Sequence, residues 1–147
     1  MAKAAMKFLQ AYVKNMVEIG GQNLPKAISA DLGAKLSQMY QKRDIADFEK
    51  GLKKMYKALN GKPKILKIDD KTYDITIKYQ RNSCPIGGHH NPQFAKQFQD
   101  SVCSPYTIGF LNSYDASKKY KGVIEKCIIS SGNCYCKYIL HMEEKQQ

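Results

Sequence analysis

Apolar side chains recur at helical spacing over three segments in the first part of the chain. Gly20-Gly21 separates the first segment from the second, and Pro25 suits the first turn of a helix. The third segment ends at Asn60-Gly61, with Pro63 just beyond it. The pattern therefore predicts helices at 4–19, 25–41 and 45–59.

The period changes to two after Lys64, where Tyr73, Ile75, Ile77 and Tyr79 alternate with polar residues. That alternation is typical of a strand with one buried face. Later segments return to helix and then to strand, and Pro105 should interrupt the helix. We expect strands at 65–68, 73–79, 122–129 and 134–142, and an inserted helix at 94–114.

Helices followed by strands favour an α+β fold, in which the N-terminal helices pack on a four-stranded, mainly antiparallel sheet with one inserted helix. The 147 residues suit a single domain, with a helical part at 1–62 and a sheet part at 63–147. We find no repeat and no linker that would separate a second domain.

The candidate chemistry lies in the sheet part, where Cys103, Cys127, Cys134 and Cys136 occur with Glu125. Thiolates with a carboxylate form a donor set for a soft divalent metal. A tight turn at 131–132 would pair Cys127 with Cys136, and Cys103 would arrive from the inserted helix.

Three interpretations of these cysteines stay open: a structural zinc ion, an iron–sulfur cluster, and metal-free thiols or a reversible Cys127–Cys136 disulfide. A loop with Cys84, His89 and His90 is a further candidate for a ligand or reactive thiol. We see no Ser/His/Asp set, phosphate-binding loop or paired carboxylates, so catalysis by this chain alone is not expected.

Several sequence stretches in the sheet part resemble the 4-vinyl-reductase domain family. The stretches are 103–111 (CSPYTIGFL), 125–127 (EKC) and 132–138 (GNCYCKY). The resemblance covers about 65–140. Cys134 is an extra thiol, Asn133 stands where the family usually has Asp, and the spacing from Cys127 to Cys136 is one residue longer.

The resemblance implies a hydrocarbon-binding fold similar to that of transport-particle tethering subunits. In sensory relatives the cysteines and a Glu hold zinc, so Cys103, Glu125, Cys127 and Cys136 are the implied ligands. It also implies a pocket for apolar or aromatic molecules between helices and sheet. Candidate lining residues are Phe8, Tyr12, Met16, Met39, Tyr40, Phe48, Met55 and Tyr56.

Charge and targeting signals narrow the picture further. The net charge is +11, but the lysines are spread along the chain, without a helix-turn-helix or aromatic-basic RNA-binding pattern, which argues against nucleic-acid binding. No apolar run approaches a membrane span, and the N-terminal lysines do not suit a signal peptide, so we expect a cytoplasmic protein.

We therefore predict a small-molecule-binding or sensory domain with a structural, cysteine-rich zinc site. It would act through a partner protein or as a homodimer. The alternatives are an iron–sulfur or thiol redox protein and a dimeric adaptor that associates through its helices.

Overall fold

The computed structural model describes residues 3–21, 23–45 and 47–146. Three helices come first: α1 (Lys3–Ile19), α2 (Asn23–Lys42) and α3 (Phe48–Ala58). All three lie within a few residues of their predicted bounds. Asp47 caps α3, because its side chain accepts a hydrogen bond of 3.0 Å from the backbone N–H of Glu49.

The main sheet contains β1 (Lys62–Asp69), β2 (Thr72–Lys78), β5 (Lys118–Lys126) and β6 (Tyr135–Glu144). Its strand order is β1-β2-β6-β5, and every neighbouring pair is antiparallel. The α+β fold with a four-stranded sheet is thus confirmed. A separate two-stranded ribbon joins β3 (Ser83–Cys84) to β4 (Gly88–His89).

The inserted helix is interrupted, as its proline predicted. α4 (Pro92–Phe98) runs into a single π-helical turn, η1 (Gln99–Cys103), and then into α5 (Ser104–Tyr114). Pro105 lies in the first turn of α5 and has no N–H to donate to the preceding turn. The wider π turn accommodates this loss and turns Gln99 and Cys103 toward the interior.

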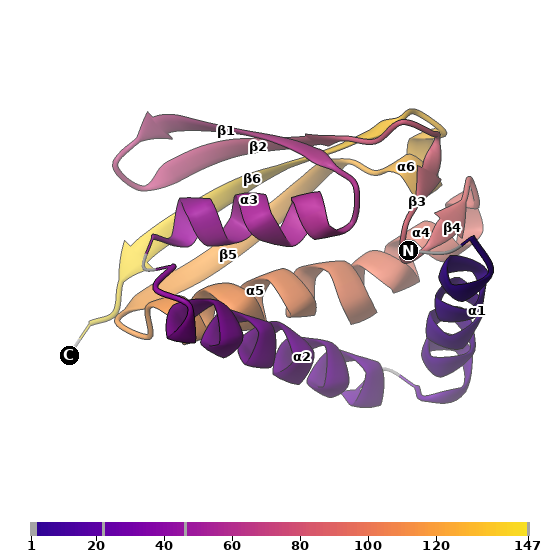
Figure 1. Cartoon of the computed structure of the whole chain (residues 1–147), viewed down its shortest axis with the longest axis horizontal. Coiled ribbons are helices and arrows are strands. Elements are labelled where there is room, and N and C mark those ends of the chain that lie inside the picture. The colour runs from indigo at the N-terminus through magenta and orange to yellow at the C-terminus, as the bar shows by residue number, and fades with distance from the viewer. Residues whose placement is uncertain (1–2, 22, 46, 147) are drawn as a thin grey trace.

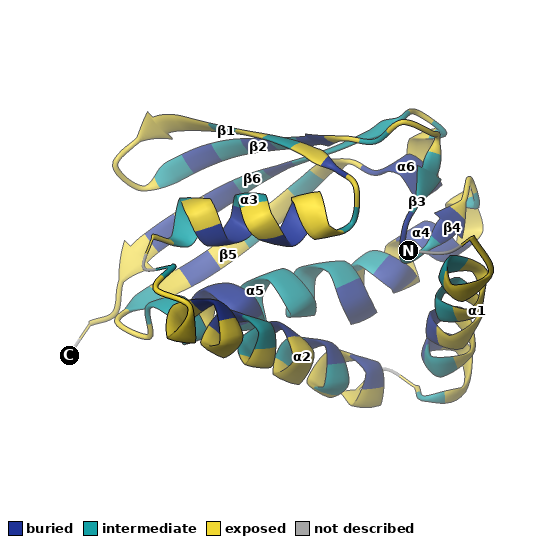
Figure 2. Cartoon of the chain, in the orientation of Figure 1, coloured by how far each residue is buried: buried dark blue, intermediate teal, exposed yellow. Residues whose placement is uncertain are grey.

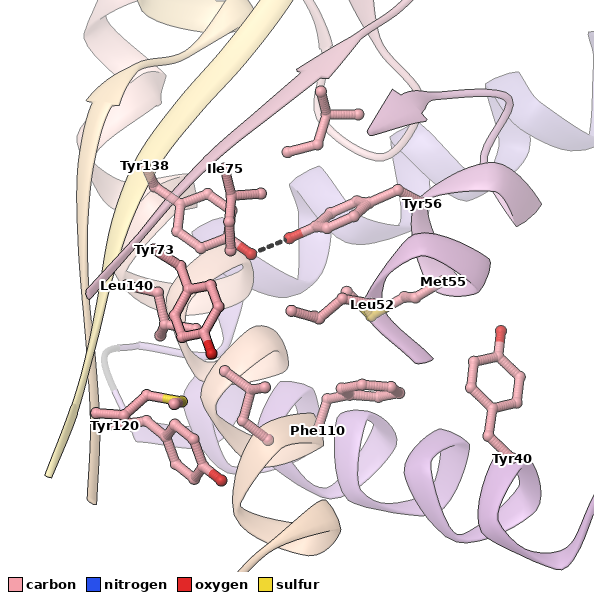
Figure 3. Packing of buried hydrophobic residues seen from close by; sticks show 13 residues of the cluster. Tyr40, Leu52, Met55, Tyr56, Tyr73, Ile75, Phe110, Tyr120, Tyr138 and Leu140 are labelled. Atoms are coloured by element: carbon pink, nitrogen blue, oxygen red, sulfur yellow. Dashed lines mark hydrogen bonds between the residues drawn. The ribbon is translucent and has the colours of Figure 1, made fainter. Parts of the chain in front are cut away.

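The main core fills the space between the sheet and helices α3 and α5, which lie on the same side of the sheet (Figure 1). Alternate residues of β2, including Ile75 and Ile77, meet Leu52 of α3 and Phe110 of α5 there. The phenol groups of Tyr56 and Tyr138 share a hydrogen bond of 2.6 Å inside this core (Figure 3).

A second, smaller core lies beside the first, where α1 packs Val13 and Val17 against α4. Phe98 is fully buried in it. Most of the α1 surface remains exposed, in contrast to the inward face of α3 (Figure 2).

The last hairpin differs from its prediction. β5 ends at Lys126 and β6 begins at Tyr135, and α6 (Ile128–Ser131) fills the connection. Ile128 and Ile129 are fully buried in this short helix, so their apolar pattern reflects a packed turn rather than a strand. Gly132, with φ of 75°, ends it in the left-handed region.

Candidate functional site

A cavity of about 120 Å³ lies between α3, the inner face of the sheet and the η1–α5 segment. Its wall is mostly apolar, and side chains from both cores contribute to it. Representative wall residues are Met55, Tyr56, Ile77, Phe98, Ile124 and Leu140.

Four cysteines line this cavity: Cys84, Cys103, Cys127 and Cys136. Cys136 points inward from β6, opposite Ile77 of β2. Cys103 ends the π turn, and Cys127 is the residue before α6. The structure therefore brings together three of the cysteines singled out in the sequence, and adds Cys84.

The other two predicted ligands do not belong to this wall. Glu125 lies at the irregularity of β5, and its carboxylate is 3.5 Å from the ammonium group of Lys137. Lys137 is also 3.5 Å from the carboxylate of Asp74. Cys134, in the connection before β6, is not among the cavity-lining residues.

The predicted metal-centred function is wrong. Across the part of the chain that the structure describes, no group of three or more His, Cys, Asp or Glu side chains is placed to hold a metal ion. Glu125 pairs with lysine, and α6 replaces the tight turn that should have placed Cys134 beside Cys127 and Cys136. The expected cysteine cluster for zinc or an iron–sulfur centre is therefore absent from these residues.

The cavity thiols have different electrostatic environments. Burial raises the pKa of Cys84 and, more strongly, that of Cys103. Cys136 donates a hydrogen bond to Cys127, which raises the pKa of Cys136 and lowers that of Cys127. The Gln99 side chain and the backbone N–H groups of Ile129 and Ser130 also lower the pKa of Cys127.

Tyrosine phenols near the cavity stay protonated. Burial raises the pKa of Tyr56, Tyr79 and Tyr138 above the usual range, and it raises the pKa of Tyr106 to about 12. These phenols can therefore form hydrogen bonds in or near the cavity, but they carry no charge.

The prediction of which helical residues line the cavity is only partly correct. Met55 and Tyr56 do line the cavity, and Tyr40 and Phe48 belong to the main core or pack against it. Phe8, Tyr12 and Met39 are exposed instead.

The sequence analysis missed Cys84 as a member of the cavity wall. The β3–β4 ribbon carries this thiol, whose sulfur accepts a hydrogen bond of 3.3 Å from the backbone N–H of Gly87. The available signal was the glycine pair Gly87-Gly88 shortly after Cys84, because glycine permits a close approach of the backbone to the sulfur.

Comparison with known proteins gives a fold but no family. No family model matches the chain, and no curated protein matches it, so membership of the 4-vinyl-reductase family stays a prediction. The fold is similar to that of trafficking protein particle complex subunit 3 from Naegleria fowleri, determined covalently bound to palmitic acid. The TM-score is 0.65 at 10% identity, over 98% of this chain and 96% of that one.

The predicted likeness to tethering subunits is therefore confirmed at the level of the fold, and the similar structure is a subunit of a protein complex. The predicted sensory-domain function, which depended on the cysteine-rich metal site, is corrected together with that site. None of the described helices has the length and apolar character to span a bilayer.

Proposed function

We propose that this chain is an assembly subunit that forms a homodimer through α1 and α2. The observation that carries the proposal is the apolar surface that these helices present to solvent. Single exposed apolar side chains are ordinary, but a contiguous apolar patch on a protein surface usually marks an interaction site.

The exposed surface spans both helices. On α1, Phe8 stacks on Tyr12 with ring centroids 6.4 Å apart, and Phe8 is 73% exposed. On α2, Leu24, Leu32 and Met39 are about half exposed, and their spacing places them on one broad face of the helix. We call these five residues the α1–α2 apolar surface.

The pattern along α2 suits a second copy of the same chain. Leu32 lies near the middle of the stripe, with Leu24 and Met39 at almost equal distances on either side. In an antiparallel pair of α2 helices with the two-fold axis near Leu32, Leu24 of one copy would face Met39 of the other. A two-fold interface requires this self-complementarity.

Charge supports the same arrangement. Asp31 and Lys35 flank the centre of the stripe and form an ion pair of 2.8 Å within the helix. Around the same axis, Asp31 of each copy approaches Lys35 of the other, so opposite charges meet. α2 has 20 residues and is about 30 Å long, which together with α1 offers enough surface for a standard interface.

The test is the mass of the protein in solution, measured by light scattering during gel filtration over a range of concentrations. We expect a dimer for the natural chain and a monomer for Leu32→Glu. Leu66→Glu is the matched control, since Leu66 is similarly exposed (50% against 53%) but lies on β1. A natural chain that is monomeric at every concentration, or a Leu32→Glu variant that remains dimeric, contradicts the proposal.

A second candidate role concerns the cavity: that it holds an acyl chain as part of the folded subunit. The apolar wall and its thiols support this role, and a protein of similar fold is covalently bound to palmitic acid. Burial of the chain would stabilise the subunit, because binding to the folded state alone favours folding.

Filling the cavity tests this role. Equilibrium dialysis with labelled octanoic acid should show binding that Ile124→Phe abolishes, since Ile124 lines the cavity. Val123→Phe is the matched control, because Val123 is the neighbouring residue on the exposed side of β5. Absence of binding, or equal binding by both variants, contradicts the role.

A further inference from the structure

Strand β1 forms one edge of the main sheet, and no other described strand pairs with its outer side. It is the outermost strand at the top of Figure 1, with β2 on its inner side. The second half of β1 is exposed throughout, whereas β2 buries every second residue (Figure 2). An uncovered edge strand presents free backbone groups with which another extended segment can pair.

The hydrogen bonds of β2 show which residues of β1 point to this free edge. Tyr79, directly after β2, donates its backbone N–H to the Cys134 carbonyl on the β6 side, at 2.8 Å. Alternate residues of an antiparallel strand direct their backbone groups to opposite neighbours, so the even-numbered residues of β2 face β1. They pair with the even-numbered residues of β1 over 62–66. The alternate residues of β1 therefore point their backbone groups to the free edge: Pro63, Ile65 and Lys67.

The proline in β1 agrees with that orientation. Pro63 has no N–H, and a proline within a sheet is tolerated where its nitrogen faces away from the neighbouring strand. All three residues offer a carbonyl group to an added strand, but only Ile65 and Lys67 also offer an N–H. Because the register of β1 is irregular between Lys67 and Asp69, the regular pairing site centres on Ile65.

The side chains at the start of β1 make this edge basic. Lys62 lies directly opposite Lys78 of β2, and Lys64 follows on the same face of β1. All three are exposed, and within the described part of the chain none of them forms an ion pair. Like charges directly opposite each other destabilise a sheet, and an acidic partner would offset this repulsion.

Charge also distinguishes between possible partners. Lysines on an edge strand oppose pairing with a second copy of the same strand, because the two copies would bring their lysines together. A strand with acidic side chains would instead meet opposite charge. The edge therefore suits a different, acidic chain better than it suits a second copy of β1.

The second half of β1 sets a different requirement. Leu66 lies on the same face as the two lysines and is 50% exposed. Lys67 already pairs with the carboxylate of Asp70, at 3.3 Å. A fitting partner strand would thus carry carboxylates only opposite the start of β1 and an apolar side chain opposite Leu66.

We propose that the β1 edge binds an extended acidic segment of a partner protein, which joins the sheet as an added strand antiparallel to β1. Antiparallel pairing is the more stable kind, and every neighbouring pair in this sheet has it. Backbone hydrogen bonds supply affinity in this mode of recognition, and side chains supply specificity. The site is separate from the α1–α2 apolar surface, so the inference goes beyond the proposed dimer and does not depend on it.

The experiment uses the purified full chain and a fluorescently labelled peptide, Thr-Val-Val-Glu-Val-Glu, whose binding is measured by fluorescence anisotropy. In the proposed register the peptide runs from opposite Lys67 to opposite Lys62, so its two glutamates meet Lys64 and Lys62. We expect saturable binding that weakens as salt is added, because salt screens exposed charges. The same peptide with lysine in place of both glutamates should not bind.

Charge reversal on the two edges of the sheet gives a matched comparison. Lys62→Glu combined with Lys64→Glu should weaken binding by about tenfold and should allow the lysine peptide to bind. Lys119→Glu combined with Lys121→Glu makes the same change of net charge on β5, at the opposite edge, and should have a much smaller effect. Thermal melting of each variant confirms that it is folded.

Two N-methylated peptides test strand pairing itself. In the proposed register the N–H of the second valine points to the carbonyl of Ile65, whereas the N–H of the first valine points away from β1. Methylation of the second valine nitrogen should abolish binding, and methylation of the first should leave it nearly unchanged.

Several results would overturn the inference. The first is absence of binding by the acidic peptide at low salt. The second is equal weakening by the two charge-reversed variants, which would mean attraction by net charge alone. Equal effects of the two methylated peptides would exclude strand pairing. A changed mass of the Lys62→Glu, Lys64→Glu variant in solution would mean that a second copy pairs at β1.

Discussion

Helices α2 and α3 use their apolar residues in opposite ways. α3 buries Leu52, Met55 and Tyr56 against the sheet and turns lysines such as Lys54 to solvent. α2 buries small residues and leaves large ones such as Leu32 exposed. An ordinary amphipathic helix follows the α3 pattern.

The small buried face of α2 explains the difference. Ser29, Gly33 and Ser37 lie on that face, and α2 packs closely along α5. A Cβ atom at Gly33 would meet the backbone oxygen of Tyr106, and one at Gly109 would meet that of Ala30. α2 therefore has one face adapted to α5 and a second, apolar face that this chain does not cover. In the proposed dimer, the exposed apolar residues of α2 would belong to an interface rather than to a poorly packed core.

The sharpest test of this contrast is a matched pair of leucine truncations. Leu52→Ala should lower the free energy of unfolding by about 2–5 kcal/mol, because it leaves a cavity beneath α3. Leu32→Ala should change the stability of the monomer by less than about 0.5 kcal/mol, since its side chain is half exposed. Urea unfolding at low protein concentration measures both, and similar losses in the two variants would contradict the contrast.

The close face of α2 predicts a second effect. Gly33→Ala should lower the free energy of unfolding by about 1–3 kcal/mol, because the added methyl group forces α2 away from α5. The control is Ala27→Gly, at an exposed position of the same helix, where the loss of helix propensity costs about 1 kcal/mol or less. A Gly33→Ala variant as stable as the natural chain would show that the helices do not approach closely.

The sequence predicted the elements with a clear period and missed what depends on packing. The helices and β2 followed from local spacing, because each buries one face. The apolar pair Ile128-Ile129 fits a strand and a buried helical turn equally well, and only the surrounding structure decides. Because a helical turn forms there, Cys134 lies in the connection before β6 and is not among the cavity-lining residues.

The cavity was predictable only in part, because some of its residues are brought together by tertiary packing rather than by local sequence spacing. Cys127 and Cys136 are near in sequence, so a local argument placed them together. Cys84 is brought to the cavity by the β3–β4 ribbon, and Cys103 by the π turn. Neither element has a periodic sequence pattern from which it could be predicted. The exposure of Leu32 and Met39 was equally hidden, since an apolar stripe looks the same whether this chain or a second one covers it.

The buried face of α3 also carries a polar group, which predicts a pH effect. Burial raises the pKa of Tyr56, so its neutral form stabilises the fold below the unfolded pKa of about 10, and this stabilisation is lost as pH rises further. Tyr56→Phe should cost about 1–3 kcal/mol at neutral pH, because the Tyr138 hydroxyl loses its partner. The variant should then lose less stability than the natural chain above pH 10. If the free energy of unfolding falls equally with pH in the two proteins above pH 10, this account is contradicted.

The smallest expected effect concerns the charges on the exposed side of α2. Asp31→Asn removes an exposed i,i+4 ion pair with Lys35 and should change monomer stability by no more than about 0.5 kcal/mol. In the antiparallel dimer the same change removes two contacts between copies, so dimer dissociation should rise by more than the monomer loses. Asp70→Asn is the control, because its ion pair with Lys67 lies in the turn after β1. Sedimentation equilibrium at low and high salt measures the difference, which added salt should reduce because it screens exposed charges. If both substitutions affect dimerisation equally, the interface lies elsewhere. The apolar face of α2 would then not be explained by dimerisation.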